Sequence, residues 1–180
     1  MKVKQSQRLS FELMTSKDAG LLYELDQDPE VLRYINGGKI STEEDIRNIM
    51  IPRMMEYLNK EKGWGLWKVL ETHNNEFIGW ILIRPVGFFT EDPQYENLEI
   101  GWRFHQKSWG KGYATEAAKQ IVKEIEGQKK AKKITAIAVE ENTASIKIMK
   151  KIGMTFTHKG VHKDPLGDME VVYYEMSLLK

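Results

Sequence analysis

The chain has 180 residues, a length that predicts one domain large enough to bury a sizeable core. Its 27 basic and 26 acidic side chains nearly balance, so the overall charge does not indicate a surface for nucleic acid or for anionic membranes. No cysteine occurs, which excludes disulfides, thiolate metal sites and a cysteine acyl-enzyme. No apolar run is long enough to span a membrane or to serve as a signal peptide, and we expect a cytoplasmic protein.

The four histidines show no pattern that is typical of a metal site. His158 and His162 are four residues apart, but their surroundings predict a strand and not a helical face. We therefore expect surface histidines and no bound metal.

The first 35 or so residues predict a strand and two short helices. Residues 8–14 alternate enough for a strand, and Thr15 or Ser16 can cap the helix that follows. Asp28 is a suitable N-cap for a further helical turn, with Pro29 at its first position.

A third helix and a hairpin are predicted next. Ser41 and Glu44 form a capping-box pattern, and Pro52 is expected to kink or interrupt the helix that they start. Two runs, 65–70 and 77–83, then read as an antiparallel hairpin.

The remaining elements alternate strands with helices. Residues 85–97 contain two prolines and little periodicity, and we expect a long loop there that shapes a substrate opening. After it we expect a central strand 98–104, a helix from 114 onward, a strand 133–139, a helix 143–152, and two final strands at 154–158 and 169–178.

Two glycines stand where the central strand passes into the long helix. Gly110 and Gly112 flank Lys111, and helix N-termini with nearby glycines hold anions on free backbone N–H groups. The spacing fits neither a dinucleotide fingerprint nor a P-loop, because Tyr113 and Ala114 follow Gly112. A glycine-containing turn without a ligand remains the alternative at this point.

Four motifs, taken in order, resemble those of the GCN5-related N-acetyltransferases (GNATs). They are residues 99–102 (EIGW), 109–117 (WGKGYATEA), 142–146 (NTASI) and 151–154 (KIGM). Near the N-terminus, residues 28–34 (DPEVLRY) are similar to the RimJ/RimL-like branch of that family.

The resemblance implies a single α+β domain over residues 1–180. It implies a mixed, mostly antiparallel, twisted sheet of about six to seven strands flanked by about four helices. It also implies acetyl-coenzyme A (acetyl-CoA) as cofactor, with coenzyme A as product, and direct transfer of the acetyl group to a primary amine in a ternary complex. The amine would belong to a protein N-terminus or a small molecule, and homodimer formation is left open.

The same resemblance implies the cofactor site. The pyrophosphate would lie on the turn formed by Trp109, Gly110, Lys111, Gly112, Tyr113 and Ala114. Trp109 replaces the Gln or Arg that is usual in the family's motif, a departure that is common in the RimJ/RimL-like branch.

The strand before this turn is expected to bulge at Gly101 and to separate from the next strand. The separation would leave backbone groups free to pair with pantetheine, namely those of Trp102, Arg103 and Phe104. Asn142 and Ser145 are expected to contact the coenzyme arm, with helix capping as the alternative for both.

Transfer to an amine needs a base, because an alkylammonium with a pKa of about 10.4 must lose its proton. Glu99 is our candidate, directly or through water, since it lies on the strand face opposite Leu98 and Ile100. A structural ion pair is the alternative for this carboxylate.

The proton donor for the departing thiolate is not assigned. Many relatives carry a tyrosine seven residues after the asparagine, where this chain has Met149. Tyr173, Tyr174 or water is left as a candidate. A non-catalytic acyl-CoA sensor and a protein-interaction module without cofactor therefore remain alternative functions.

Overall fold

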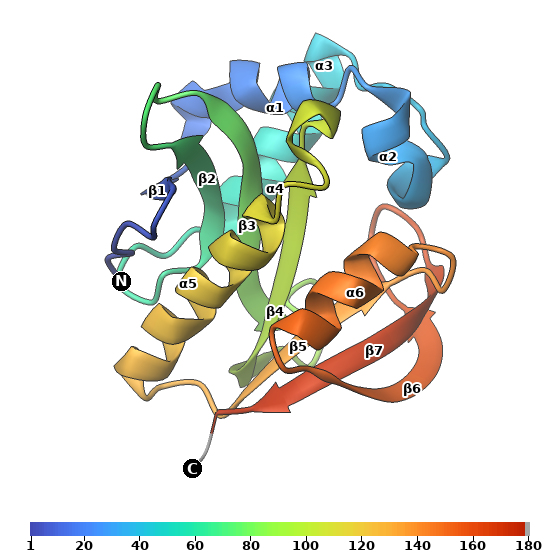
Figure 1. Ribbon diagram of the computed structural model, residues 1–180. Coiled ribbons are helices and arrows are strands. Elements are labelled where there is room, and N and C mark those ends of the chain that lie inside the picture. The colour runs from blue at the N-terminus through green and yellow to red at the C-terminus, as the bar shows by residue number, and fades with distance from the viewer. Residues whose placement is uncertain (179–180) are drawn as a thin grey trace.

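A seven-stranded sheet runs through the molecule in the order β1-β2-β3-β4-β5-β7-β6 (Figure 1). The computed structural model describes residues 1–178. The strands are β1 (Leu9–Leu13), β2 (Gly65–Glu71), β3 (Phe77–Val86), β4 (Gln94–Phe104), β5 (Lys133–Ala138), β6 (Thr155–His162) and β7 (Met169–Ser177). Only β4 and β5 pair in parallel within this sheet of the described residues. The predicted mixed, mostly antiparallel α+β fold is confirmed.

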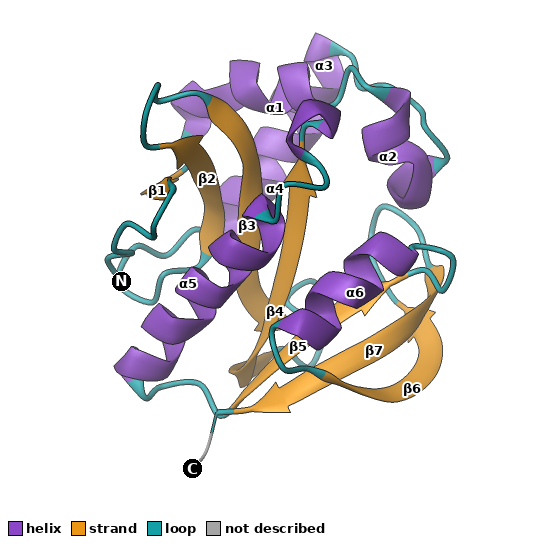
Figure 2. Cartoon of the chain, in the orientation of Figure 1, coloured by secondary structure: helices purple, strands orange, loops and turns teal. Residues whose placement is uncertain are grey.

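Helices cover both faces of the sheet (Figure 2). They are α1 (Ala19–Leu25), α2 (Pro29–Asn36), α3 (Glu43–Asp45), α4 (Ile51–Tyr57), α5 (Tyr113–Gln128) and α6 (Thr143–Lys151). Ile81 and Ile83 of β3 pack in one core with α5 and α6, whereas Leu82 packs in a second core with α1 and α4. The alternation of side chains along a strand thus divides the buried residues between two layers.

The two central strands separate as expected. The parallel pairing of β4 with β5 ends at Glu99 and Thr135, while β4 continues to Phe104. The expected bulge at Gly101 is wrong, because Gly101 pairs in regular register with Leu82. The irregularity in this hairpin lies instead next to Pro85, whose missing N–H interrupts the ladder.

The loop expected at 85–97 is shorter than predicted. β3 extends to Val86, β4 begins at Gln94, and only residues 87–93 connect them. Pairing between Val86 and Gln94 overrides the weak local signal of the two prolines. Within residues 1–178, no helix is long and apolar enough to cross a membrane.

The cap of the third helix lies one residue later than predicted. Thr42 Oγ1 accepts from the Asp45 N–H at 3.0 Å, and the Asp45 carboxylate accepts from the Thr42 N–H at 2.9 Å. Ser41 donates to Asp26 at 3.0 Å and so is not available as a cap. A π-helical turn, η2 (Ile46–Met50), precedes Pro52, consistent with the expected interruption.

Candidate active site

A groove of about 540 Å³ lies where the end of β4 meets α2, α6 and the start of α5. It brings together most of the residues predicted for the cofactor, from three separate parts of the sequence. They are Trp102, Arg103, Phe104, Trp109, Gly110, Gly112, Tyr113, Ala114, Asn142 and Ser145. Lys111 does not line the groove, although it belongs to the same turn.

The glycine turn has the backbone shape that the sequence suggested. Gly110 and Gly112 have φ of 73° and 80°, values that favour glycine. Gly112 is the N-cap of α5 and supplies no side-chain hydrogen bond, so the first N–H groups of α5 are uncapped. A Cβ at Gly110 would meet no atom within 4 Å, so the conformation and not crowding requires glycine there.

A residue that the sequence analysis did not single out fixes this turn. Arg8, from the segment before β1, pairs with Glu116 at 2.7 Å and donates through Nη1 to the Lys111 carbonyl at 3.0 Å. Its guanidinium also lies 4.4 Å from the centre of the Tyr113 ring. Burial alone would raise the pKa of Glu116, but hydrogen bonds from Ser6 and Arg8 lower it below its ordinary value.

One hydrogen bond shows which backbone groups of β4 point away from β3 and toward the groove. The His105 N–H donates to the Ile78 carbonyl at 3.0 Å, so Phe104 and its partner on β3 form a non-hydrogen-bonded pair. By alternation, the backbone groups of Phe104 and Trp102 point away from β3, whereas those of Arg103 point toward it. Two of the three predicted backbone sites therefore face the gap.

Arg103 and Trp109 have other partners. The Arg103 guanidinium forms an ion pair with Asp26, the C-cap residue of α1, on the face opposite α5. The Trp109 indole N–H donates to the Phe104 carbonyl at 2.9 Å. The residue that replaces the family's usual Gln or Arg thus holds the glycine turn against the end of β4.

Asn142 and Ser145 lie at the start of α6. The Asn142 side chain accepts from the Ser145 N–H at 3.1 Å, which is an N-cap bond. Ser145 Oγ accepts from the Trp102 indole N–H at 3.2 Å. Both residues line the groove, so capping and a cofactor contact are compatible.

Glu99 lies on the other face of β4, in a buried ion pair. Its two carboxylate oxygens accept from Arg84 Nε at 3.0 Å and Nη2 at 3.1 Å. Burial alone would lower the pKa of Arg84, but the Glu99 carboxylate raises it above its ordinary value. Burial also raises the pKa of Tyr57, whose ring faces Arg84, to about 12.

The position where many relatives have a tyrosine and the two candidate tyrosines lie in different surroundings. Met149 of α6, at the first of these positions, is 1% exposed and packs in the core with residues of α5. Tyr174 is buried against Phe156, whereas Tyr173 is on the opposite strand face and stacks on His158 with ring centres 4.3 Å apart. Burial and the Glu99 carboxylate raise the pKa of Tyr173.

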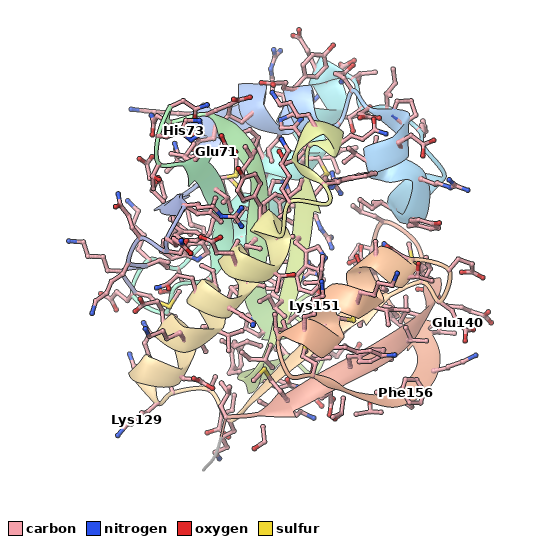
Figure 3. All side chains as sticks on the ribbon, in the orientation of Figure 1. Glu71, His73, Lys129, Glu140, Lys151 and Phe156 are labelled. Carbon is pink, nitrogen blue, oxygen red and sulfur yellow. The ribbon has the colours of Figure 1, made fainter. Side chains whose placement is uncertain are left out.

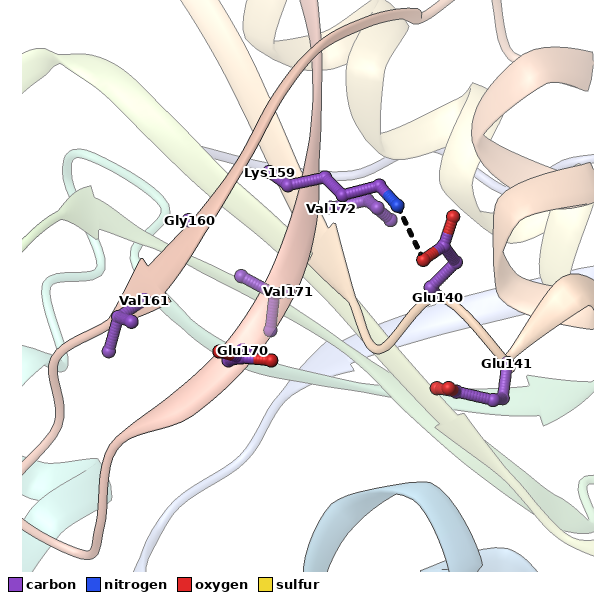
Figure 4. A pocket seen from close by; sticks show the side chains of 8 residues that line it. All are labelled: Glu140, Glu141, Lys159, Gly160, Val161, Glu170, Val171 and Val172. Atoms are coloured by element: carbon purple, nitrogen blue, oxygen red, sulfur yellow. Dashed lines mark hydrogen bonds and ion pairs between the residues drawn. The ribbon is translucent and has the colours of Figure 1, made fainter.

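A second cavity, of about 340 Å³, lies beside β6 and β7 (Figure 4). Three of its lining residues are glutamates, Glu140, Glu141 and Glu170. Glu140 pairs with Lys159 at 2.6 Å. This cavity contains none of the predicted site residues.

Comparisons with known proteins identify the family of this chain. Residues 8–155 match the family model of the acetyltransferase (GNAT) domain. The uncharacterized N-acetyltransferase YnaD of Bacillus subtilis is 33% identical over 151 residues, which are 83% of this chain and 80% of that protein. The uncharacterized protein YkkB of the same organism is 32% identical over 160 residues, 83% of each chain.

Solved structures share the fold. A GNAT-family acetyltransferase from Bacillus anthracis has a TM-score of 0.77 and 30% identity, with 99% of each chain covered. The aminoglycoside acetyltransferase AAC(6')-Ib, solved with coenzyme A and kanamycin, has a TM-score of 0.72 at 18% identity over 94% of each chain, a likeness of fold alone. The family model and the relatives together show that this chain belongs to the GNAT family of acetyltransferases.

Proposed function

We propose that the protein transfers an acetyl group from acetyl-CoA to a primary amine, by direct attack within a ternary complex. The observation that carries the proposal is the groove, in which an uncapped helix N-terminus lies beside a free strand edge. The first suits a pyrophosphate, and the second suits the amide groups of pantetheine. Because both features line one groove, a single ligand that carries a pyrophosphate and amide groups can contact both.

The chain's own residues would divide the binding of the cofactor among them. The backbone of the turn, from Gly110 through Lys111 and Gly112 to Tyr113 and Ala114, would hold the pyrophosphate. Because these donors are backbone groups held by glycine conformations, their positions depend little on side-chain identity. The thioester supplies an activated acetyl group, and the protein supplies orientation and proton transfer.

The pantetheine arm would lie along β4. The outward backbone groups of Trp102 and the N–H of Phe104 would pair with it, since the Phe104 carbonyl already accepts from Trp109. Asn142 and Ser145 would lie on its other side. Arg103 would contribute only through its position in the wall, since its charge is satisfied by Asp26.

Glu99 is the proposed base. It is the last residue of β4 that still pairs with β5, so it lies where the two strands begin to separate. Arg84 takes one lone pair from each carboxylate oxygen, and the others can accept a proton from an amine or a bridging water. The proton donor to the thiolate is not part of the proposal.

The proposal extends to a single domain over residues 1–180, to the RimJ/RimL-like branch and to work in the cytoplasm, without nucleic acid, membrane or metal. The acceptor would be a protein N-terminus or a small-molecule amine. Structural neighbours include both kinds of enzyme, the aminoglycoside acetyltransferase above and RimL, a ribosomal-protein α-N-acetyltransferase solved with coenzyme A at 12% identity and a TM-score of 0.75. Those likenesses concern the fold alone, and the acceptor must be found by experiment.

The test is a calorimetric titration with acetyl-CoA, followed in the same sample by thiol release against a panel of amines. The panel would contain peptides with free N-termini, aminoglycosides, polyamines and amino acids. Binding with release for one class supports the enzyme and identifies its acceptor class. Binding without release from any amine would favour a sensor, and absence of binding would overturn the proposal in favour of an interaction module.

A further inference from the structure

Two lysines of α6 face the groove. Lys147 and Lys151 are four positions apart, which places them on one face of the helix, and both line the groove. Figure 3 shows Lys151 at the end of α6 that lies nearest α5. Both side chains belong to exposed residues, so their ammonium groups are free to meet a ligand.

Neither lysine is paired with an acid. The acidic residue on the facing wall, Glu30 of α2, has Arg33 at 3.6 Å. Among residues 1–178, no carboxylate lies within ion-pair distance of Lys147 or Lys151. Lys159 beside the second cavity differs, since Glu140 neutralises it.

Stabilisation of α6 by its dipole does not explain why both lysines face the groove. Lysines in the last turn of a helix interact favourably with the macrodipole, and Lys150 and Lys151 both occupy that turn of α6. Lys147 lies a turn earlier, where the effect has faded. Lys150 has the same dipole interaction as Lys151 but does not line the groove, so orientation toward the groove is a separate property.

Coenzyme A presents two separate anionic groups to such a groove, a pyrophosphate and a 3′-phosphate on the ribose. The N-terminus of α5 can serve the first but leaves the second without a partner. We propose that Lys147 and Lys151 bind the 3′-phosphate, so that the protein selects coenzyme A thioesters over carriers that lack this group. This inference rests on the proposed function and identifies a specificity site within the same groove.

The test measures dissociation constants for coenzyme A and 3′-dephospho-coenzyme A with three proteins. These are the unchanged chain, the double variant Lys147→Ala/Lys151→Ala, and the control Lys150→Ala. Two exposed lysine–phosphate contacts predict about a tenfold preference of the unchanged chain for coenzyme A at low salt. The double variant should lose that preference by weakening coenzyme A alone, whereas Lys150→Ala should keep it. Rising salt should reduce the preference toward unity.

The outcomes separate this inference from the proposed function. If the unchanged chain binds both ligands equally, or if the double variant weakens both by the same factor, the 3′-phosphate is not the ligand of these lysines and only this inference fails. If the unchanged chain binds neither ligand, the proposed function fails with it. Thermal unfolding of each variant checks the fold, and substitutions at exposed positions should change stability little.

Discussion

The groove and the opposite face of β4 handle charge in different ways. In the groove, the donors are uncapped backbone N–H groups and two lysines without acidic partners. On the opposite face, Arg84, Arg53 and Arg103 are each paired with a carboxylate, those of Glu99, Asp164 and Asp26. The first surface is ready for an anion that comes from outside, whereas the second has satisfied its charges internally. Substitutions in the groove should therefore change ligand affinity, whereas those on the opposite face should change stability.

The largest expected effect is that of Gly112→Val on cofactor affinity. A β-branched residue at φ of 80° is strained and would distort the start of α5, so we expect affinity for coenzyme A to fall about a hundredfold. Calorimetry measures it. Gly127→Ala is the matched control, because Gly127 lies within α5, lacks a positive φ and has open space where the added methyl group would lie. Unchanged affinity in Gly112→Val would refute the phosphate turn.

Glu99→Gln should reduce both turnover and stability. Loss of the base predicts a fall in kcat of about a hundredfold, with little change in coenzyme A affinity. Loss of the charge beside buried Arg84 predicts a loss of about 3 kcal/mol in the free energy of unfolding. Steady-state kinetics and urea unfolding measure the two effects.

Arg84→Gln separates these two roles of Glu99. It breaks the same ion pair and should cost similar stability, but it keeps the carboxylate. If Glu99 is the base, Arg84→Gln should retain much more turnover than Glu99→Gln. Equal losses in the two variants would assign Glu99 a structural role only.

Arg8→Ala should weaken coenzyme A binding without changing kcat. Removal of the guanidinium releases the Lys111 carbonyl and leaves Glu116 without its ion pair. We expect about a fivefold rise in the dissociation constant, the size of effect typical for one partly exposed charged contact. Arg47→Ala removes an exposed arginine on the helical segment before α4 and serves as the control. A drop in kcat at saturating cofactor would contradict this interpretation.

The smallest effect concerns acid stability. Because the pKa of Glu116 is lowered from its ordinary value of 4.5 in the folded protein, its contribution to stability is present above that value. The contribution is lost as pH falls through the lower folded pKa. Glu116→Gln should therefore show a shallower loss of stability than the unchanged chain on acidification below the ordinary value, measured by urea unfolding at several pH values. An identical slope in the two proteins would assign the acid sensitivity to other carboxylates.

Local sequence signals predicted the parts of the site that are local. The two glycines, the helix that follows them and the separation of β4 from β5 follow from short motifs and from the family resemblance. The cap of the third helix was displaced by one residue, since Ser41 and Thr42 both begin a suitable pattern and only a distant contact with Asp26 decides between them. Such a contact leaves no trace in the local sequence.

The partners of the key charges could not be predicted in the same way. Arg84 meets Glu99 only because of the register of the β3–β4 hairpin, which shifts beside Pro85 where a loop was expected. Arg8 meets Glu116 across most of the chain, and no periodicity connects them. The sequence thus indicated candidate residues for the chemistry but not which arginine accompanies each carboxylate.

The contact of Arg8 with the glycine turn connects the N-terminal segment to the proposed pyrophosphate site. Hydrogen bonds to Glu116 hold residues 6–8 in place, and Arg8 holds the carbonyl of the turn that is proposed to bind phosphate. Free-energy coupling is reciprocal, so whatever strengthens one end must strengthen the other by the same amount. Bound coenzyme should therefore slow amide hydrogen exchange and proteolysis ahead of β1, far along the sequence from the residues that touch it.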